Sequence, residues 1–312
     1  MALSPFEDIR VVLAEPSASL RRDIRDTLLA KGVRHIVDTG NMAQVMEALR
    51  GGAVDILIGD TKLPEGDLST LIHKVRHGEI GDNPFIVTIT LVSTPNRDLV
   101  HKVINSGTDH VLVKPFDVCE IFAQMEALTH GRKKFVVTTD YIGPDRRKAH
   151  RPGTIEIPRL DVPNPLRQRM TGHMNEFSQK RAINATMAVI NEQKVVRHAY
   201  QIGWLMNRIR HIRDGAEPDD DGTGLKGHLD RLQWVSNDMS KRIKSTRYAH
   251  VTDLCMTLVN MTRDVVARGD GVKDEDMRLI AKLAQVIQGA FDEDRTNPLT
   301  FRPKPEEPAA ME

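Results

Sequence analysis

Cysteine is nearly missing from this 312-residue sequence, which contains only Cys119 and Cys255. Two cysteines so far apart in the chain exclude a disulfide framework and a zinc site made of thiolates. Aromatic residues are scarce as well, at 4% of the composition. We therefore expect a helix-rich protein in a reducing environment rather than a large β-sandwich with an aromatic core.

Long apolar runs are also missing. No segment reaches the roughly 18 consecutive apolar residues that a membrane-spanning helix needs. Glu7 and Asp8 stand where a signal peptide would have basic and then apolar residues. The sequence thus predicts a soluble, cytoplasmic protein without a membrane partner.

Neither sign of charge dominates the whole sequence, since 44 Lys and Arg balance 43 Asp and Glu. The total charge therefore gives no case for binding nucleic acid. The distribution is uneven, however. Residues 1–130 carry 13 basic and 18 acidic side chains, whereas residues 131–170 carry 10 basic and 4 acidic ones. An acidic domain followed by a basic linker is predicted.

Short apolar runs alternate with amphipathic stretches in the first part of the chain. Runs of this kind are typical of strands that are buried on both faces of a parallel sheet. Helix signals lie between them, such as Asp117 and Glu120 in a capping box. We predict a doubly wound (βα)5 α/β domain over residues 8–130. The runs are Ile9 to Ala14, Val54 to Gly59, Phe85 to Val92 and Val111 to Val113.

The rest of the chain is predicted to contain three parts. Residues 131–165 form a basic, proline-rich linker that crosses a surface, because its prolines are too frequent for a helix. Residues 166–294 show helical periodicity and form an all-α bundle or hairpin. Residues 295–312 are rich in Pro and Glu and form a disordered tail.

Function in a doubly wound sheet collects beyond the carboxyl ends of the strands. These ends are predicted to carry Glu15-Pro16, Asp60, Ser93 and Lys114-Pro115-Phe116. Asp60 followed by Leu63-Pro64, with Gly107 seven residues ahead of Lys114-Pro115-Phe116, resembles a response-regulator receiver domain of two-component signalling. The resemblance covers roughly residues 8–130.

The resemblance implies phosphoryl transfer from the histidine of a kinase, or from a phosphotransfer protein, to Asp60 as the phosphoacceptor. Lys114 would stabilise the phosphoryl charge. Ser93 is the best match for the hydroxyl that responds to the phosphoryl group, with Thr90 and Thr94 as alternatives. The Lys114-Pro115 bond is implied to be cis.

One departure from the receiver pattern concerns the metal. Receivers bind Mg²⁺ with two adjacent carboxylates after the first strand, and here Glu15 is followed by Pro16. The implied metal ligands are thus Glu15 and Asp60, and we expect Mg²⁺ binding to be weak or absent. Lys62, two residues after Asp60, is an exposed lysine or a partial substitute for the cation.

The leading prediction is a response regulator that acts through protein contacts of its helical region, with a possible homodimer through that region. One alternative is a pseudo-receiver scaffold that is not phosphorylated because of Pro16. Another, less favoured, is a nucleic-acid-binding regulator that uses the basic residues 143–151. An enzyme is not expected, since the helical part shows no nucleophile with a base. His198 is interpreted as a partly exposed helix residue rather than a phosphotransfer histidine.

Overall fold

The structure is a computed structural model, and it describes residues 5–147, 157–173, 175–213, 223–268 and 273–292. Contacts divide the chain into two compact units. The first comprises residues up to 150 together with 158–186, and the second contains the helices from residue 187 onward. Each unit is described by itself.

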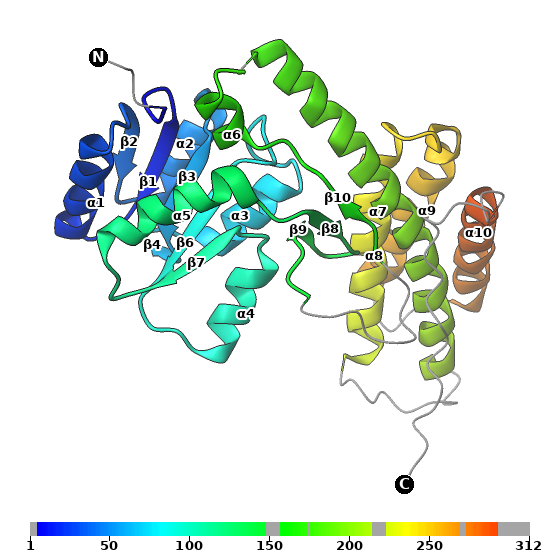
Figure 1. Cartoon of the computed structure of the whole chain (residues 1–312). Helices are drawn as coiled ribbons and strands as arrows, with labels where there is room; N and C mark the ends of the chain where they lie inside the picture. The colour runs from blue at the N-terminus through cyan, green and yellow to red at the C-terminus, as the bar shows by residue number, and fades with distance from the viewer. Residues whose placement is uncertain (1–4, 148–156, 174, 214–222, 269–272, 293–312) are drawn as a thin grey trace, which may run out of the picture. The chain divides into compact units, whose positions relative to one another are not determined.

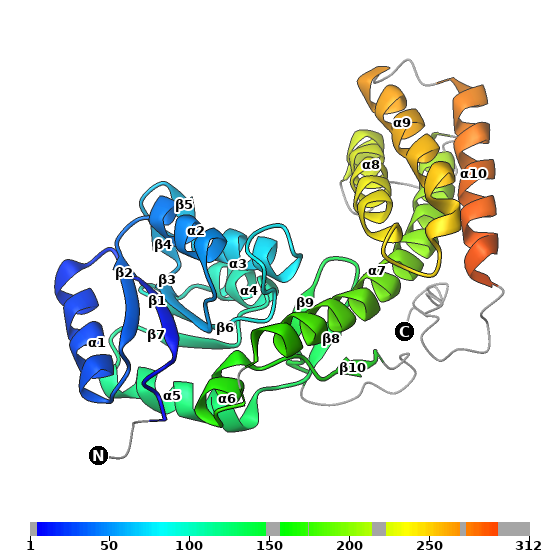
Figure 2. The ribbon, with the colours of Figure 1, turned by 90° about the horizontal axis from the view of Figure 1, so that it is seen from above.

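A five-stranded parallel sheet forms the centre of the first unit (Figures 1 and 2). Its strand order is β2-β1-β3-β6-β7, so the chain winds outward in both directions from β1 and β3. This arrangement confirms the predicted (βα)5 fold. The strands are β1 (Arg10–Ala14), β2 (His35–Thr39), β3 (Ile56–Asp60), β6 (Val87–Val92) and β7 (His110–Val113).

Four helices connect these strands and a fifth, α5, follows the last one; each of the five begins where a polar side chain accepts a hydrogen bond from the first turn. The caps are Ser17, Asn41, Asp67, Asn96 and Asp117. α1 and α5 pack on one face of the sheet, and α2 and α3 pack on the other. The helices are α1 (Ala18–Ala30), α2 (Met42–Gly51), α3 (Leu68–Arg76), α4 (Arg97–Asn105) and α5 (Val118–Gly131). A short hairpin of β4 (Lys62–Leu63) and β5 (Gly66–Asp67) precedes α3.

The segment predicted as a linker contains a small antiparallel sheet with the order β10-β8-β9. Its strands are β8 (Phe135–Val137), β9 (Ile142–Pro144) and β10 (Arg159–Leu160). β9 lies against the turn before β7, where Gly107 has a φ of +87°. A Cβ built at Gly107 would collide with the carbonyl oxygen of Ile142. The small sheet therefore depends on a glycine at this turn.

A buried ionic cluster attaches β8 to the five-stranded sheet. Asp109, just before β7, accepts hydrogen bonds from Arg76 and from Arg132, each at 2.9 Å. Both guanidinium groups also lie over the ring of Phe135, at 5.3 and 4.8 Å from its centroid. Arg76 and Phe135 are completely buried. Buried charges require partners of this kind, so the cluster fixes the position of β8.

α6 (Pro165–Met170) packs on the same unit. Leu166 is completely buried in the core that α1 and α5 share. The Nε atom of Arg169 lies 2.6 Å from a carboxylate oxygen of Asp55, which precedes β3. α6 thus belongs to the first unit, although the sequence placed residue 166 at the start of the separate helical region. Its apolar side chains complete the core next to α5.

The second unit is helical, as predicted. α7 (Glu176–Arg213) begins in the first unit and continues into the second. It is followed by α8 (Gly224–Ile243), the 3₁₀ turn η1 (Ala249–Val251), α9 (Thr252–Arg268) and α10 (Asp274–Asp292). Their inward side chains, such as Ile202, Leu232, Leu258 and Ile287, form one buried core. The predicted tail, residues 295–312, lies outside the described residues.

Candidate functional site

Three charged side chains meet at the carboxyl edge of the parallel sheet. The Nζ atom of Lys114 lies 2.6 Å from Oδ2 of Asp60 and 2.7 Å from Oε2 of Glu15. Asp60 ends β3, while Glu15 and Lys114 directly follow β1 and β7. Parallel strands end at the same edge of a sheet, which brings the three residues together. The convergence predicted from the sequence is confirmed.

Asp60 has three further hydrogen-bond donors, one of which is the hydroxyl of the adjacent Thr61, at 3.3 Å from Oδ1. Its Oδ1 atom accepts from the backbone N–H of Lys62 at 2.8 Å, and its Oδ2 atom accepts from the hydroxyl of Ser93 at 3.0 Å. Thr90 is turned elsewhere, because its hydroxyl lies 2.8 Å from that of Thr108 inside the fold. Of the two candidates Ser93 and Thr90, therefore, only Ser93 donates its hydroxyl to the Asp60 carboxylate.

The donors around Asp60 control its protonation. Burial raises the pKa of this carboxyl, but the hydrogen bonds from Lys114, Lys62 and Ser93 outweigh burial and bring the pKa below its ordinary value of 3.8. The two carboxylates in turn raise the pKa of Lys114 although burial lowers it. The site therefore holds an ionised carboxylate and a protonated lysine at neutral pH.

Glu15 is almost completely buried, with 1% of its surface exposed. Its second oxygen, Oε1, accepts a hydrogen bond from the backbone N–H of Ser17 at 3.0 Å. Pro16 is exposed and supplies no side-chain oxygen. Among the residues that the structure describes, the carboxylates at this edge are the two that Lys114 already bridges.

These residues do not fit a receiver-type Mg²⁺ site. Mg²⁺ requires near-octahedral oxygen coordination, whereas an ammonium group neutralises both carboxylates here. Within the described part of the chain, no group of three or more His, Cys, Asp or Glu side chains is placed to hold a metal ion. Lys62 itself is exposed, and its backbone N–H is bound to Asp60.

Other predicted features are also located. The peptide bond between Lys114 and Pro115 is cis, as the resemblance implied. The interpretation of His198 as partly exposed is wrong. Its ring is completely buried against the neighbouring helix α8. There its Nε2 atom lies 2.8 Å from a carboxylate oxygen of Asp238. A buried ring gives a phosphoryl donor no access, so the geometry does not support phosphotransfer by His198.

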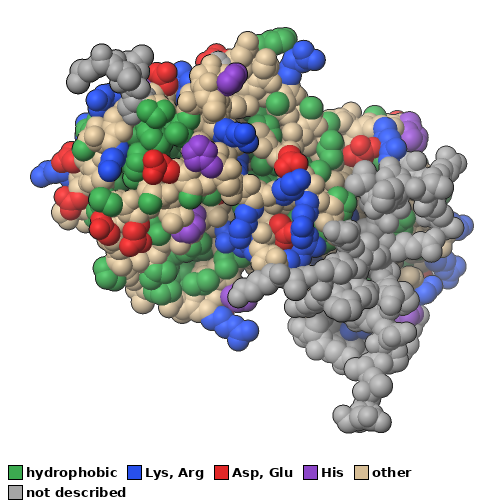
Figure 3. Space-filling model, in the orientation of Figure 1, with side chains coloured by type: hydrophobic (Ala, Val, Ile, Leu, Met, Phe, Trp, Pro, Cys, Tyr) green, Lys and Arg blue, Asp and Glu red, His purple; other side chains and the backbone are tan. Residues whose placement is uncertain are grey.

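The basic residues 143–151 are described up to residue 147. Arg146 donates a hydrogen bond to the carbonyl oxygen of Thr108, and Arg147 and Arg159 both pair with Asp145. On the face in Figure 3, basic side chains near the centre have acidic ones among them. These arginines are engaged within the protein.

Sequence reasoning missed two arginines that support the site and the fold. Arg21 in α1 donates to the backbone carbonyl of Glu15 at 2.5 Å, which holds the loop after β1. Arg76 is the buried centre of the cluster with Asp109. A signal for Arg76 was present, because it follows Leu68 and Ile72 at intervals of four residues and so shares their buried helix face.

The model of the response regulator receiver domain family matches residues 11–126. Residues 11–126 are a receiver domain. The transcriptional regulatory protein PdtaR of Mycobacterium tuberculosis is 28% identical to this chain over 117 residues, 38% of this chain and 55% of PdtaR.

Two further matches cover a similar share of the chain. The virulence transcriptional regulatory protein PhoP of Salmonella typhimurium is 30% identical over 121 residues, which cover 38% of this chain and 51% of PhoP. This chain thus spans about half the length of PhoP and PdtaR. The receiver domain of the Francisella response regulator 1452 matches with a TM-score of 0.35 and 17% identity, over 39% of this chain and 96% of that domain.

Proposed function

We propose that this protein is a response regulator of two-component phosphorelay signalling that accepts a phosphoryl group at Asp60. The partner would be a histidine kinase or a phosphotransfer protein. The observation that carries the proposal is the carboxylate of Asp60 beside the ammonium of Lys114 and the hydroxyl of Ser93. A nucleophile, a fixed positive charge and a responsive hydroxyl are the parts that the protein's own side chains contribute to aspartyl phosphorylation.

The chemistry assigns one role to each residue. A carboxylate oxygen of Asp60 would attack the phosphorus atom, forming a P–O bond while the P–N bond to the donor imidazole breaks. Lys114 would remain hydrogen-bonded to the transferred group and offset its negative charge. Ser93 would donate its hydroxyl to a phosphoryl oxygen instead of to Asp60. The helical region would transmit the change through protein contacts.

A phosphorylation assay tests the proposal. The full chain is incubated with acetyl phosphate, with and without Mg²⁺, and its intact mass is measured. We expect the mass of one added phosphoryl group in the wild type, and none in the Asp60→Asn variant. Modification that persists in this variant would assign the phosphoryl group to another residue.

A second candidate function is a pseudo-receiver scaffold. Pro16 and the bridge from Lys114 to both carboxylates favour it, because these features leave little room for a cation. Absence of the added mass at every donor and Mg²⁺ concentration would support the scaffold and reject phosphorylation. The nucleic-acid alternative is less well supported, since Arg146 and Arg147 already have partners.

A further inference from the structure

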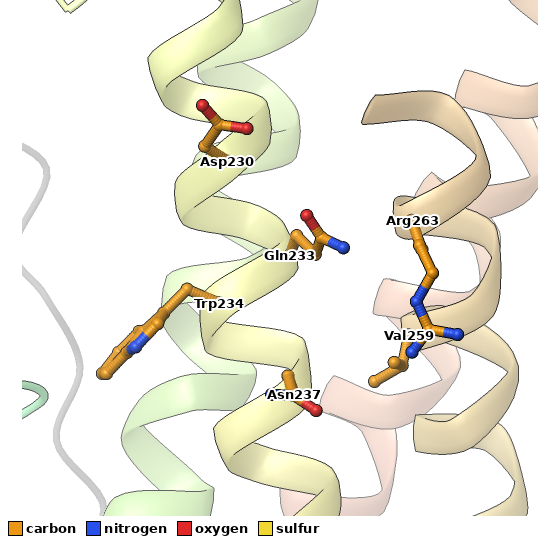
Figure 4. A pocket seen from close by; sticks show the side chains of 6 residues that line it. All are labelled: Asp230, Gln233, Trp234, Asn237, Val259 and Arg263. Atoms are coloured by element: carbon orange, nitrogen blue, oxygen red, sulfur yellow. The ribbon is translucent and has the colours of Figure 1, made fainter. Parts of the chain in front are cut away.

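A hollow of about 280 Å³, lined by both polar and apolar side chains, lies between α8 and α9 in the second unit (Figure 4). The lining side chains come from the two helices only. They are Asp230, Gln233, Trp234 and Asn237 of α8 with Val259 and Arg263 of α9. In Figure 4, Gln233 and Asn237 extend toward α9, whereas the ring of Trp234 extends to the other side of α8.

Opposite charges line this hollow without pairing with each other. Asp230 is exposed and has no ion pair among the described residues. Arg263 makes only a 3.5 Å contact to Asn260, three residues earlier on its own helix, within the described contacts. A carboxylate and a guanidinium group are therefore both available to groups outside the unit.

The side chains that line the hollow follow regular spacing on both helices. Asp230, Gln233 and Asn237 are separated by three and four residues on α8. On α9, the lining residues Val259 and Arg263 are four residues apart, and Met256, outside the hollow, precedes Val259 by three residues. Such a spacing gives one straight stripe along each helix, and the two stripes form a face suited to packing against further helices.

Apolar surface accompanies the charges. Met256 is 42% exposed, and Trp234, at the flank of the hollow, is 39% exposed. Large apolar side chains of this kind are common at the centres of protein interfaces. The guanidinium group of Arg231 lies 4.5 Å from the centroid of the Trp234 ring and holds it in place.

We propose that the α8–α9 face, defined by Asp230, Gln233, Asn237, Met256 and Arg263, binds the same face of a second copy of this chain. The proposal rests on the proposed function, in which the helical region acts through protein contacts. A twofold axis in the contact plane would bring Asp230 of each copy to the partner's Arg263. Each interface would thus contain two equivalent ion pairs.

A second copy fits this face because the face complements itself. A twofold interface uses the same patch on both subunits, so each patch must contain the groups that its partner needs. Here a carboxylate and a guanidinium group occur together. The amides of Gln233 and Asn237 can each donate and accept, so they too can bond to their equivalents across the axis.

Charge exchange tests this interface. Self-association of the full chain is measured by sedimentation equilibrium over a hundredfold range of concentration. Asp230→Arg and Arg263→Asp alone place like charges opposite each other, and each is expected to weaken dimerisation at least about tenfold. The double variant Asp230→Arg/Arg263→Asp reverses both charges together, and we expect it to recover most of the wild-type affinity.

The control is Arg278→Asp, which reverses an exposed charge on α10 and should leave the association unchanged. A wild-type chain that stays monomeric over the whole range would overturn the proposal. So would a double variant no tighter than either single variant, with helicity by circular dichroism showing that all variants are folded. Phosphorylation of Asp60 is measured separately by mass, so failure of one proposal does not imply failure of the other.

Discussion

At the scale of single residues, Lys114 is the positive charge that pairs with both buried carboxylates at the sheet edge. It neutralises two carboxylates, Glu15 and Asp60, whose side chains are 1% and 4% exposed. Removing one partner of a buried ion pair lowers stability, because the remaining charge stays buried away from water and no longer has an opposite charge beside it. The bridge therefore contributes to stability as well as to the proposed chemistry.

Lys114→Met should lower the free energy of unfolding by about 2–4 kcal/mol at neutral pH. The pKa of Asp60 in the folded state lies below 3.8, so its contribution is present above pH 3.8 and is lost as the pH falls through the folded-state pKa. The difference between variant and wild type should shrink in this acidic range. Urea unfolding at neutral and at acidic pH measures it.

Lys134→Met is the matched control. Lys134 pairs with Asp161 at 2.9 Å, but both side chains are more than half exposed. Exposed pairs of this kind contribute about 0–1 kcal/mol, so the control should unfold nearly like the wild type at both pH values. If both variants lose the same free energy of unfolding, the Lys114 bridge contributes no more to stability than an exposed ion pair.

Pro16→Asp should tighten Mg²⁺ binding. The substitution adds a carboxylate next to Glu15, and each added anionic oxygen favours a hard cation. Pro16→Ala removes the ring without adding an oxygen and should leave the Mg²⁺ affinity unchanged. Calorimetric titration with MgCl₂ compares the three proteins. If the wild type binds Mg²⁺ as tightly as Pro16→Asp, the interpretation of Pro16 as the cause of a weak metal site is incorrect.

At the scale of secondary-structure elements, the turn at Gly107 joins the receiver domain to the small sheet. Gly107→Ala should cost about 3 kcal/mol of stability, because alanine is strained at a positive φ and its Cβ would collide with the Ile142 carbonyl. Gly131→Ala is the comparison, since no atom lies within 4 Å of its added Cβ. Thermal unfolding of both variants gives the result, and similar melting temperatures would contradict this account of the turn.

The elements differ in how far the sequence could predict them. The strand ends with Asp60 and Lys114 were predictable because local apolar runs define strands and parallel strands share an edge. The sequence also favoured Ser93 over Thr90, and the side-chain orientations at the end of β6 agree, since Ser93 contacts Asp60 and Thr90 contacts Thr108. The β8–β10 sheet was not predictable, since its position depends on pairs such as Asp109 with Arg132, which are distant in sequence.

At the scale of the whole molecule, several charged side chains of the predicted linker have partners within the protein. In the predicted linker, Arg146 donates to the carbonyl oxygen of Thr108, and Arg147 pairs with Asp145. The hydrogen bond from Arg147 is the main cause that lowers the pKa of Asp145. Within the described parts of the chain, no helix is long and apolar enough to cross a membrane.

Nucleic-acid binding should accordingly be weak. Filter binding of duplex DNA to the full chain, at two salt concentrations, should give little retention and a small dependence on salt, because few phosphate contacts can form. An Arg146→Ala/Arg147→Ala double variant should behave like the wild type. Strong retention that falls steeply with salt, and that this variant loses, would restore the nucleic-acid alternative.

The small sheet and α6 also determine where this receiver can be exchanged between proteins. A fusion cut after α5 would discard Arg132, Phe135 and Leu166, and would leave their buried contacts on the receiver side open to solvent. A cut after Thr171 would keep them. The segment that can be moved between proteins as a unit therefore includes the small sheet and α6 in addition to the part that matches the receiver family. This applies to designed chimeric sensors and to gene fusion during evolution alike.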